Sequence, residues 1–140
     1  MKNLIICNFP IGPKFNGGSM TVWGLVSFYL DNKENLNLFL ICSSNQKNSD
    51  QYNECISILN KNNLNYKIFY YNEKKINVFK KLYNFFVSII FGKPNFFFPH
   101  HKSLKDEIEK KINELKFNQI ICYHFDALSS CYDLKNLKLL

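Results

Sequence analysis

Short apolar runs alternate with amphipathic segments along most of this 140-residue chain, and that order restricts the fold more than any other feature. The run at Lys2–Asn8 has the composition of a strand buried in a parallel sheet, and the runs at Leu36–Cys42 and Tyr66–Tyr71 are the second and third predicted strands. Strands that alternate with helices join into parallel sheets through right-handed crossovers. The sequence therefore predicts an α/β fold, a Rossmann-like parallel sheet with helices on both faces.

The bounds of the other elements follow from apolar periodicity, capping residues and turn residues. The predicted helices lie at Met20–Leu30, Gln51–Lys61, Ile76–Phe91, Ser103–Leu115 and Ala127–Tyr132, and a fourth strand at Phe117–His124. Ser103 is the expected N-cap of its helix. The chain is long enough for one domain and too short for two of ordinary size, so residues 1–140 are expected to form a single domain.

The segment Ile76–Phe91 is unusually apolar and has lysines at and before its start. One interpretation is a helix buried against the sheet with a lysine-rich outer edge, and this is favoured for most of its length. The other is a basic amphipathic surface that docks on an anionic membrane through its phenylalanines and through Lys74, Lys75, Lys80 and Lys81.

The net charge of +7 favours a polyanionic neighbour, either an anionic membrane surface or a phosphorylated substrate. All 18 basic residues are lysine, and the absence of arginine argues against a protein that reads a nucleic-acid sequence. The five cysteines show no C-x-x-C spacing, which fits a reducing compartment. No apolar run is long enough for a signal peptide or a membrane span. We expect a cytoplasmic protein, with peripheral attachment to the inner face of the membrane as an option.

A glycine pair stands between the first strand and the following helix, within Asn16-Gly17-Gly18-Ser19. Glycine lets backbone N–H groups approach a ligand, and a helix N-terminus carries partial positive charge, so a phosphate or carboxylate is the natural ligand. The same residues also suit a purely structural loop in which Ser19 caps the helix. Neither the dinucleotide-binding fingerprint nor the P-loop is present. The residues alone leave both interpretations open.

Ligands of open parallel sheets collect beyond the carboxyl ends of the strands, where His124 and Asp126 are expected to lie. His124 can bind substrate hydroxyls or transfer a proton, because its unperturbed pKa is near neutrality; alternatively, its ring simply packs at a capped strand end. His100 and His101 are discounted as a metal pair, since no third ligand stands at a recognisable spacing. No catalytic triad or nucleophile elbow is present, and neither a metal nor another cofactor is expected.

The stretch Phe15-Asn16-Gly17-Gly18-Ser19-Met20 follows the first strand, and Asn118-Gln119-Ile120-Ile121-Cys122-Tyr123-His124-Phe125-Asp126-Ala127-Leu128 spans the end of the fourth. They resemble the glycine-rich loop and the later strand ending in a histidine in the N-terminal domain of GT-B fold glycosyltransferases of family 4. The resemblance covers nearly the whole chain. It implies the N-terminal half of a GT-B architecture, an acceptor-side domain that is incomplete at its C-terminus.

By this resemblance the chain would help transfer a sugar from a nucleotide-sugar donor to a surface glycan or glycolipid in polysaccharide biosynthesis. The implied roles are donor diphosphate binding by Gly17, Gly18 and Ser19, catalysis by His124, and secondary or acceptor contacts by Asn16 and Asp126.

Members of that family carry a second domain that holds the nucleotide sugar. A separate donor-binding domain is therefore expected as a partner, and the isolated chain is expected to be inactive. A competing hypothesis from another class is a non-catalytic α/β module whose glycine loop holds a phosphate or a partner protein.

Overall fold

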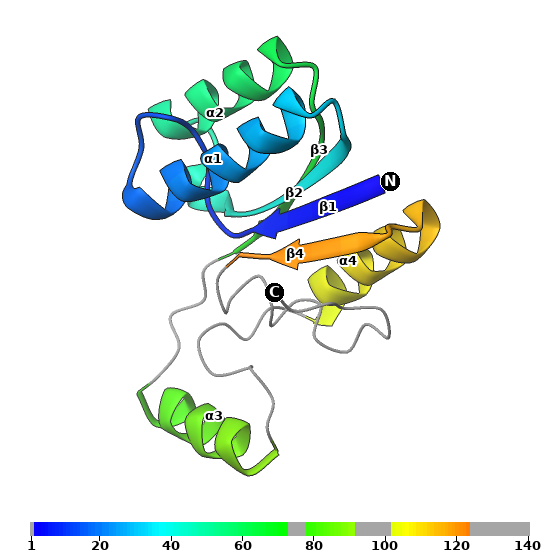
Figure 1. Cartoon of the computed structure of the whole chain (residues 1–140). Helices are drawn as coiled ribbons and strands as arrows, with labels where there is room; N and C mark the ends of the chain where they lie inside the picture. Colours follow the sequence, from blue (N-terminus) through cyan, green and yellow to red (C-terminus); the bar gives the residue numbers. More distant parts are fainter. Residues whose placement is uncertain (1, 73–77, 92–101, 124–140) are drawn as a thin grey trace.

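The computed structural model describes residues 2–72, 78–91 and 102–123. Within these ranges four strands form one sheet, and every neighbouring pair is parallel. The strands are β1 (Lys2–Cys7), β2 (Asn35–Ser43), β3 (Asn65–Tyr71) and β4 (Gln119–Cys122), in the spatial order β3-β2-β1-β4 (Figure 1). The predicted α/β fold with a parallel sheet is confirmed.

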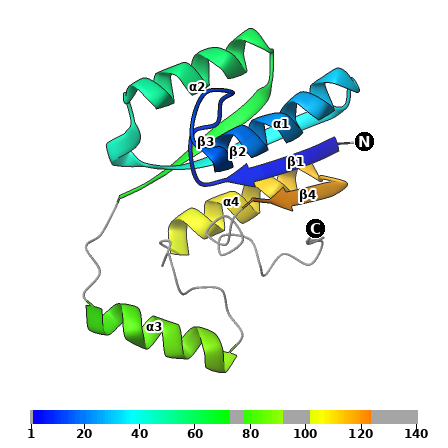
Figure 2. The same cartoon turned by 60° about the vertical axis from the view of Figure 1, so that its left-hand side comes forward.

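Helices connect these strands, and three of them cover the sheet. They are α1 (Gly17–Asp31), the short 3-10 helix η1 (Ser44–Gln46), α2 (Asp50–Lys61), α3 (Val78–Phe91) and α4 (Lys102–Leu115). Helices α1 and α2 lie on one face of the sheet and α4 lies on the other (Figures 1 and 2). The sheet therefore has helices on both faces, as the sequence predicts.

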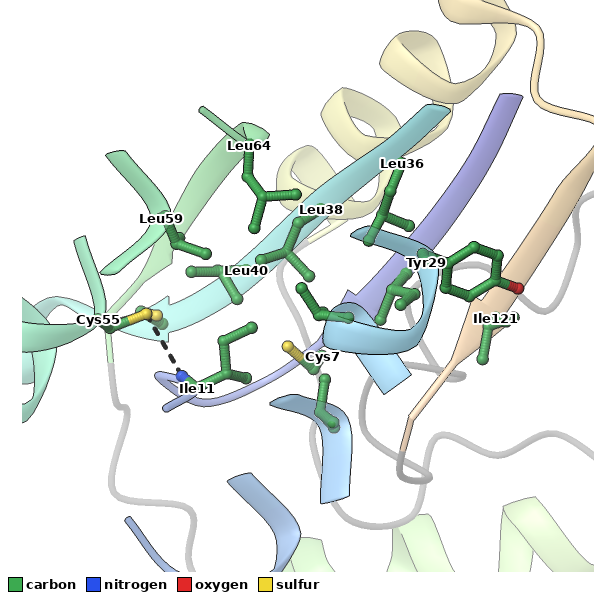
Figure 3. Close-up of a cluster of buried hydrophobic side chains, with 14 residues drawn as sticks. Cys7, Ile11, Tyr29, Leu36, Leu38, Leu40, Cys55, Leu59, Leu64 and Ile121 are labelled. Atoms are coloured by element: carbon green, nitrogen blue, oxygen red, sulfur yellow. Dashed lines mark hydrogen bonds between the residues drawn. The ribbon is translucent and has the colours of Figure 1, made fainter. Parts of the chain in front are cut away.

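The face under α1 and α2 holds the larger of two apolar cores (Figure 3). Alternate residues of β1 and β2 point into it, because successive side chains of a strand point to opposite faces. Helix α1 contributes Val22 and Val26, and α2 contributes Cys55 and Leu59, all fully buried. This core fixes both helices on the sheet and so fixes the loops that lead into them.

The opposite face packs against α4. Leu104, Ile108 and Ile112 are spaced by four residues, so they share one side of the helix and are buried against the sheet. The aromatic residues Phe39 of β2 and Phe69 of β3 belong to the same cluster, with ring centroids 5.1 Å apart.

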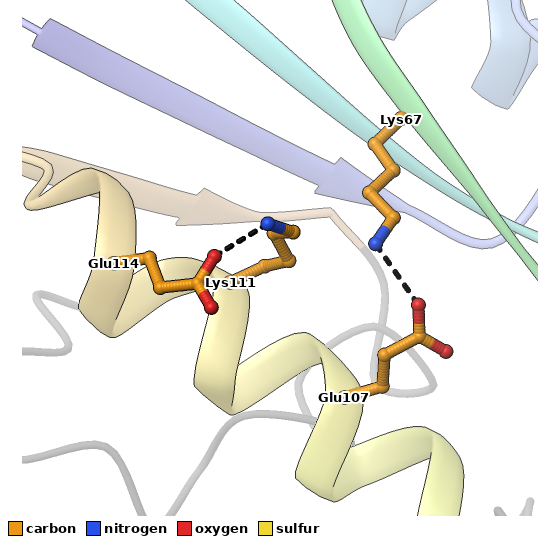
Figure 4. Close-up of polar contacts among 4 residues, drawn as sticks. All are labelled: Lys67, Glu107, Lys111 and Glu114. Carbon is orange, nitrogen blue, oxygen red and sulfur yellow. Dashed lines mark hydrogen bonds and ion pairs between the residues drawn. The ribbon is translucent and has the colours of Figure 1, made fainter.

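Ion pairs on α4 are exposed and add little to this packing (Figure 4). Lys67 of β3 contacts Glu107 at 2.9 Å, and its side chain is 34% exposed while that of Glu107 is 55% exposed. Lys111 pairs with Glu114 within the helix. Exposed pairs of this kind contribute little to stability, because water screens their attraction. Apolar burial, and not charge, holds α4 on the sheet.

Three helices begin earlier than predicted, among them α2, which starts one residue early at Asp50. Helix α1 starts at Gly17, and its N-cap is Asn16, whose side chain accepts a hydrogen bond from the N–H of Ser19 at 3.0 Å. Helix α4 starts at Lys102, so Ser103 lies in its first turn. The predictions of Ser19 and Ser103 as N-caps are therefore wrong. A serine near a helix start matches the capping pattern at more than one position, and the sequence does not show which residue has the extended backbone of a cap.

Helix α3 lies away from the sheet in both views (Figures 1 and 2). Its apolar side chains are exposed, with an exposed fraction of 81% for Phe79 and 62% for Ile89. The prediction that most of this helix is buried against the sheet is wrong, because helical periodicity identifies an apolar face without identifying the surface that it contacts. Within the described ranges, no helix combines the length and the apolar character that crossing a membrane requires.

Candidate functional site

The path of the chain through the sheet reverses between β1 and β4. From β1 the chain runs outward through β2 to β3 with α1 and α2 on one face, and it returns to β4 on the other side of β1 after α4 on the opposite face (Figure 2). In open parallel sheets, ligands bind beyond the carboxyl ends of the strands at such a reversal. The residues that follow β1 and β4 are therefore the candidates for a site.

The loop between β1 and α1 is fixed by a buried hydroxyl. Ser19 is 0% exposed, and its Oγ accepts a hydrogen bond from the N–H of Gly12 and donates one to the carbonyl oxygen of Pro10, both at 3.0 Å. Gly12 and Pro10 are themselves buried. One side chain in the first turn of α1 thus holds the Pro10–Gly12 part of the loop in place.

A second contact ties the same loop to α2. Ile11 is fully buried in the core, and its N–H donates a hydrogen bond to the Sγ of Cys55 at 3.3 Å (Figure 3). A Cβ atom at Gly12 would lie 2.9 Å from the ring of Phe15, so this position has no room for a larger residue unless the ring moves. The loop is therefore anchored on both helices of this face.

The partial positive charge at the N-terminus of α1 is not compensated by an acidic side chain of the helix. The N–H groups of Gly17 and Gly18 have no intrahelical acceptor, as is general for the first turn of a helix, while the N–H of Ser19 donates to Asn16. The first turn of α1 has no acidic residue, whereas the first turn of α2 has Asp50. Helix dipole and free N–H groups together favour an external anion at α1.

Gly18 lies beside the end of β4. A Cβ atom added to it would lie 3.6 Å from Cζ of Phe9 and 3.8 Å from Cε1 of Tyr123, which are ordinary contact distances. These two rings pack edge to face, with centroids 5.9 Å apart. A Cβ atom on Gly17 would meet nothing within 4 Å. The glycine pair thus has an aromatic wall on one side and open space on the other.

Three buried thiols lie in the core next to the loop. Burial raises the pKa of Cys42 to about 12 and the pKa of Cys55 to about 11, and it raises the pKa of Cys7 well above its ordinary value. The mutual repulsion of the thiolates adds to the effect at Cys7 and Cys42. All three thiols are protonated at neutral pH, so none of them is an activated nucleophile.

Four of the six predicted site residues are consecutive in the sequence and lie within the described residues. Asn16, Gly17, Gly18 and Ser19 form the first turn of α1 at the carboxyl edge of the sheet, although Ser19 is turned into the protein as a support for the loop. The other two, His124 and Asp126, lie outside the described residues, as do His100 and His101. In the part of the chain that the structure describes, no group of three or more His, Cys, Asp or Glu residues could hold a metal ion.

Sequence reasoning missed the residues that complete this corner. Phe9 and Tyr123 come from two loops that are more than 100 residues apart in the sequence, and only the pairing of β1 with β4 brings them together. Lys14 is exposed in the same loop, but the sequence identifies it only as part of the net charge and not as a site residue. In the sequence, the only indication of a role for Lys14 is that it lies close to the glycine pair. The strand order is needed to place this pair at the candidate site.

Comparisons with known proteins give little sequence likeness. No protein-family model and no curated protein matches the chain. Among solved structures, the chain is similar to a protein of the universal stress protein family from Burkholderia pseudomallei, with a TM-score of 0.42 and 7% identity over 98% of this chain and 92% of the other.

The predicted identity as the N-terminal domain of a GT-B glycosyltransferase of family 4 is wrong, since the solved structure found to be similar is a universal stress protein family member and not a glycosyltransferase. The predicted function in sugar transfer and polysaccharide biosynthesis is wrong with it. The resemblance rested on a strand, a glycine loop and a helix, and this arrangement is general among parallel α/β sheets.

Proposed function

We propose that this chain is a non-catalytic α/β binding module that holds a phosphate group at the carboxyl edge of the sheet, between β1 and β4. One observation carries the proposal: the strand order β3-β2-β1-β4 brings the first turn of α1, which has no acidic residue of its own, to the reversal point of the sheet. Ligands of this fold class gather at that point, and an anion is the ligand that a helix N-terminus favours.

Three groups would contact the phosphate. The N–H groups of Gly17 and Gly18 would donate hydrogen bonds to its oxygens, and the exposed Lys14 would add a full positive charge. The loop that carries them is already held by Ser19, so little conformational entropy is lost on binding. These groups hold and orient an anion, and the neighbouring thiols are protonated at neutral pH, which supports binding in preference to covalent chemistry.

Replacing Gly18 with alanine should separate ligand binding from folding. The new methyl group makes only ordinary contacts, and alanine favours a helix more than glycine does, so the free energy of unfolding should be unchanged or rise by up to about 1 kcal/mol. The same methyl group stands between Gly18 and the rings of Phe9 and Tyr123, so affinity for phosphate should fall by about fivefold or more. Melting temperature and calorimetric titration with inorganic phosphate and pyrophosphate measure the two quantities.

Matched controls lie in the same helix and on a neighbouring one. Gly24 of α1 has nothing within 4 Å of its Cβ position, and Gly24→Ala should leave phosphate affinity unchanged. Lys14→Gln should weaken phosphate binding, whereas Lys61→Gln at the far end of α2 should not. Absence of any phosphate binding by the unaltered chain, or an equal loss in Gly18→Ala and Gly24→Ala, would refute the proposal.

A further inference from the structure

Helix α3 exposes a large apolar surface that no other helix of the described chain shows. The exposed fraction of its large apolar side chains runs from 37% for Phe85 to 81% for Phe79. The exposed set is Val78, Phe79, Leu82, Tyr83, Phe85, Phe86, Ile89 and Ile90. An exposed apolar surface of this size on a single helix marks a contact with another molecule.

The pattern of polar residues in α3 shows that this helix has two faces. Its only polar residues other than tyrosine, Lys80, Lys81, Asn84 and Ser88, are spaced so that their positions share one side of a helix. The remaining ten positions are apolar or tyrosine and form the other, wider side. A helix with an apolar side rich in phenylalanine and a narrow lysine-containing side is typical of one that lies in a membrane interface.

The net positive charge of the chain comes from the stretch of sequence that contains this helix. Residues 74–105 contain seven of the 18 lysines and none of the 11 acidic residues. The rest of the chain therefore has 11 lysines and 11 acidic residues and is balanced, so the net charge of +7 comes entirely from the segment that contains α3. The apolar surface and the positive charge of the chain belong to the same stretch of sequence.

We propose that α3 docks the chain on an anionic lipid bilayer. The apolar side enters the boundary between headgroups and acyl chains, and Lys80 and Lys81 of α3 contact the anionic headgroups. A second copy of the chain is a poorer occupant, because pairing through α3 would bring two segments of seven lysines together. With 14 residues, α3 is about 21 Å long and would lie along the surface of the bilayer. This inference is independent of the phosphate site.

Vesicle co-sedimentation tests the proposal with the full 140-residue chain. The chain should bind vesicles of phosphatidylcholine mixed with phosphatidylglycerol, bind pure phosphatidylcholine far less, and lose most of its binding between about 0.1 M and about 0.5 M salt. No binding to the mixed vesicles, or equal binding to both kinds, would overturn the proposal.

Two double variants of α3, each compared with a matched control, test whether α3 is responsible for the binding. Lys80→Gln with Lys81→Gln should weaken partitioning roughly thirtyfold, since each lysine near an anionic surface is worth about 1 kcal/mol. The control, Lys61→Gln with Lys110→Gln, removes the same charge from α2 and α4 and should have an effect several times smaller.

The double variant Phe86→Glu with Ile89→Glu should abolish measurable vesicle binding. Its control, Met20→Glu with Phe28→Glu, adds the same charge at exposed positions of α1 and should keep most of the binding. Melting temperatures check that all four variants fold. Equal losses in a variant and its control would overturn the proposal. So would lipid-independent self-association, measured by sedimentation equilibrium, that the Phe86 and Ile89 changes abolish.

Discussion

Replacing Ser19 with alanine should lower the free energy of unfolding by about 2 to 4 kcal/mol and also weaken phosphate binding. The hydroxyl group that is lost serves two buried backbone groups, the N–H of Gly12 and the carbonyl oxygen of Pro10. Each buried polar group left without a hydrogen bond costs about 1 to 3 kcal/mol. Phosphate affinity should fall as well, because the loop that presents Lys14 and the glycine pair would lose its anchor on α1. Urea denaturation and phosphate titration measure the two effects.

Thr21 provides the control for this change. Its Oγ1 also donates a hydrogen bond within α1, to the carbonyl oxygen of Gly17 at 2.8 Å, but it is exposed to water. Thr21→Ala should therefore change the free energy of unfolding by about 0.5 kcal/mol or less. If the two variants were equally stable, Ser19 would have no special role in the loop.

The stability of the chain should be constant from neutral pH to about pH 9 and then fall steeply. Burial raises the pKa of Cys42 from 9.0 to about 12, so the folded protein keeps a proton that the unfolded chain releases above pH 9. The favourable contribution is complete below pH 9 and is lost as the pH rises toward the folded value. At about 1.4 kcal/mol for each pKa unit, Cys42 alone accounts for about 4 kcal/mol over this window.

Cys55 and Cys7 shift in the same direction and add to this loss, although less than independently, because the three thiols interact. Denaturation curves at intervals of pH measure the effect, and Cys42→Ala should flatten the decline even though the cavity that it leaves lowers stability at neutral pH. Partial desolvation and a hydrogen bond between the hydroxyl groups of Tyr52 and Tyr70 also raise the pKa of Tyr52, which contributes above its ordinary pKa of 10.0. A decline between pH 9 and pH 10 that Cys42→Ala leaves unaltered would contradict the assignment to this thiol.

The sheet could be predicted because its information is local. The apolar runs that became β1, β2 and β3 are bounded by polar loops, and their alternation with helices requires parallel connections. The strand order could not be predicted, because it depends on which side of β1 the last strand joins, and no residue of β4 indicates this side by itself. The strand order determines where the candidate site lies.

The details of the site and of α3 depend on contacts that are distant in sequence. Ser19 suits an N-cap as well as a buried position inside the first turn, and only its partners at Gly12 and Pro10 decide between the two. In α3 the apolar periodicity predicts a helix correctly, but the same pattern fits burial against a sheet and exposure to another surface. The helix was predictable, and its surroundings were not.

The pairing of β1 with β4 also sets the order in which the fold can be completed during synthesis. Asn3 pairs with Gln119, whereas β1, β2 and β3 are all present once Tyr71 has left the ribosome. About 50 residues separate the end of β3 from the end of β4, which corresponds to about 3 to 10 seconds of translation. During this interval α4 does not yet cover the nascent sheet, so the apolar face formed by Phe39, Ile41 and Phe69 stays exposed to water. We expect the newly made chain to be a chaperone substrate during this time, and to be most prone to misassembly then.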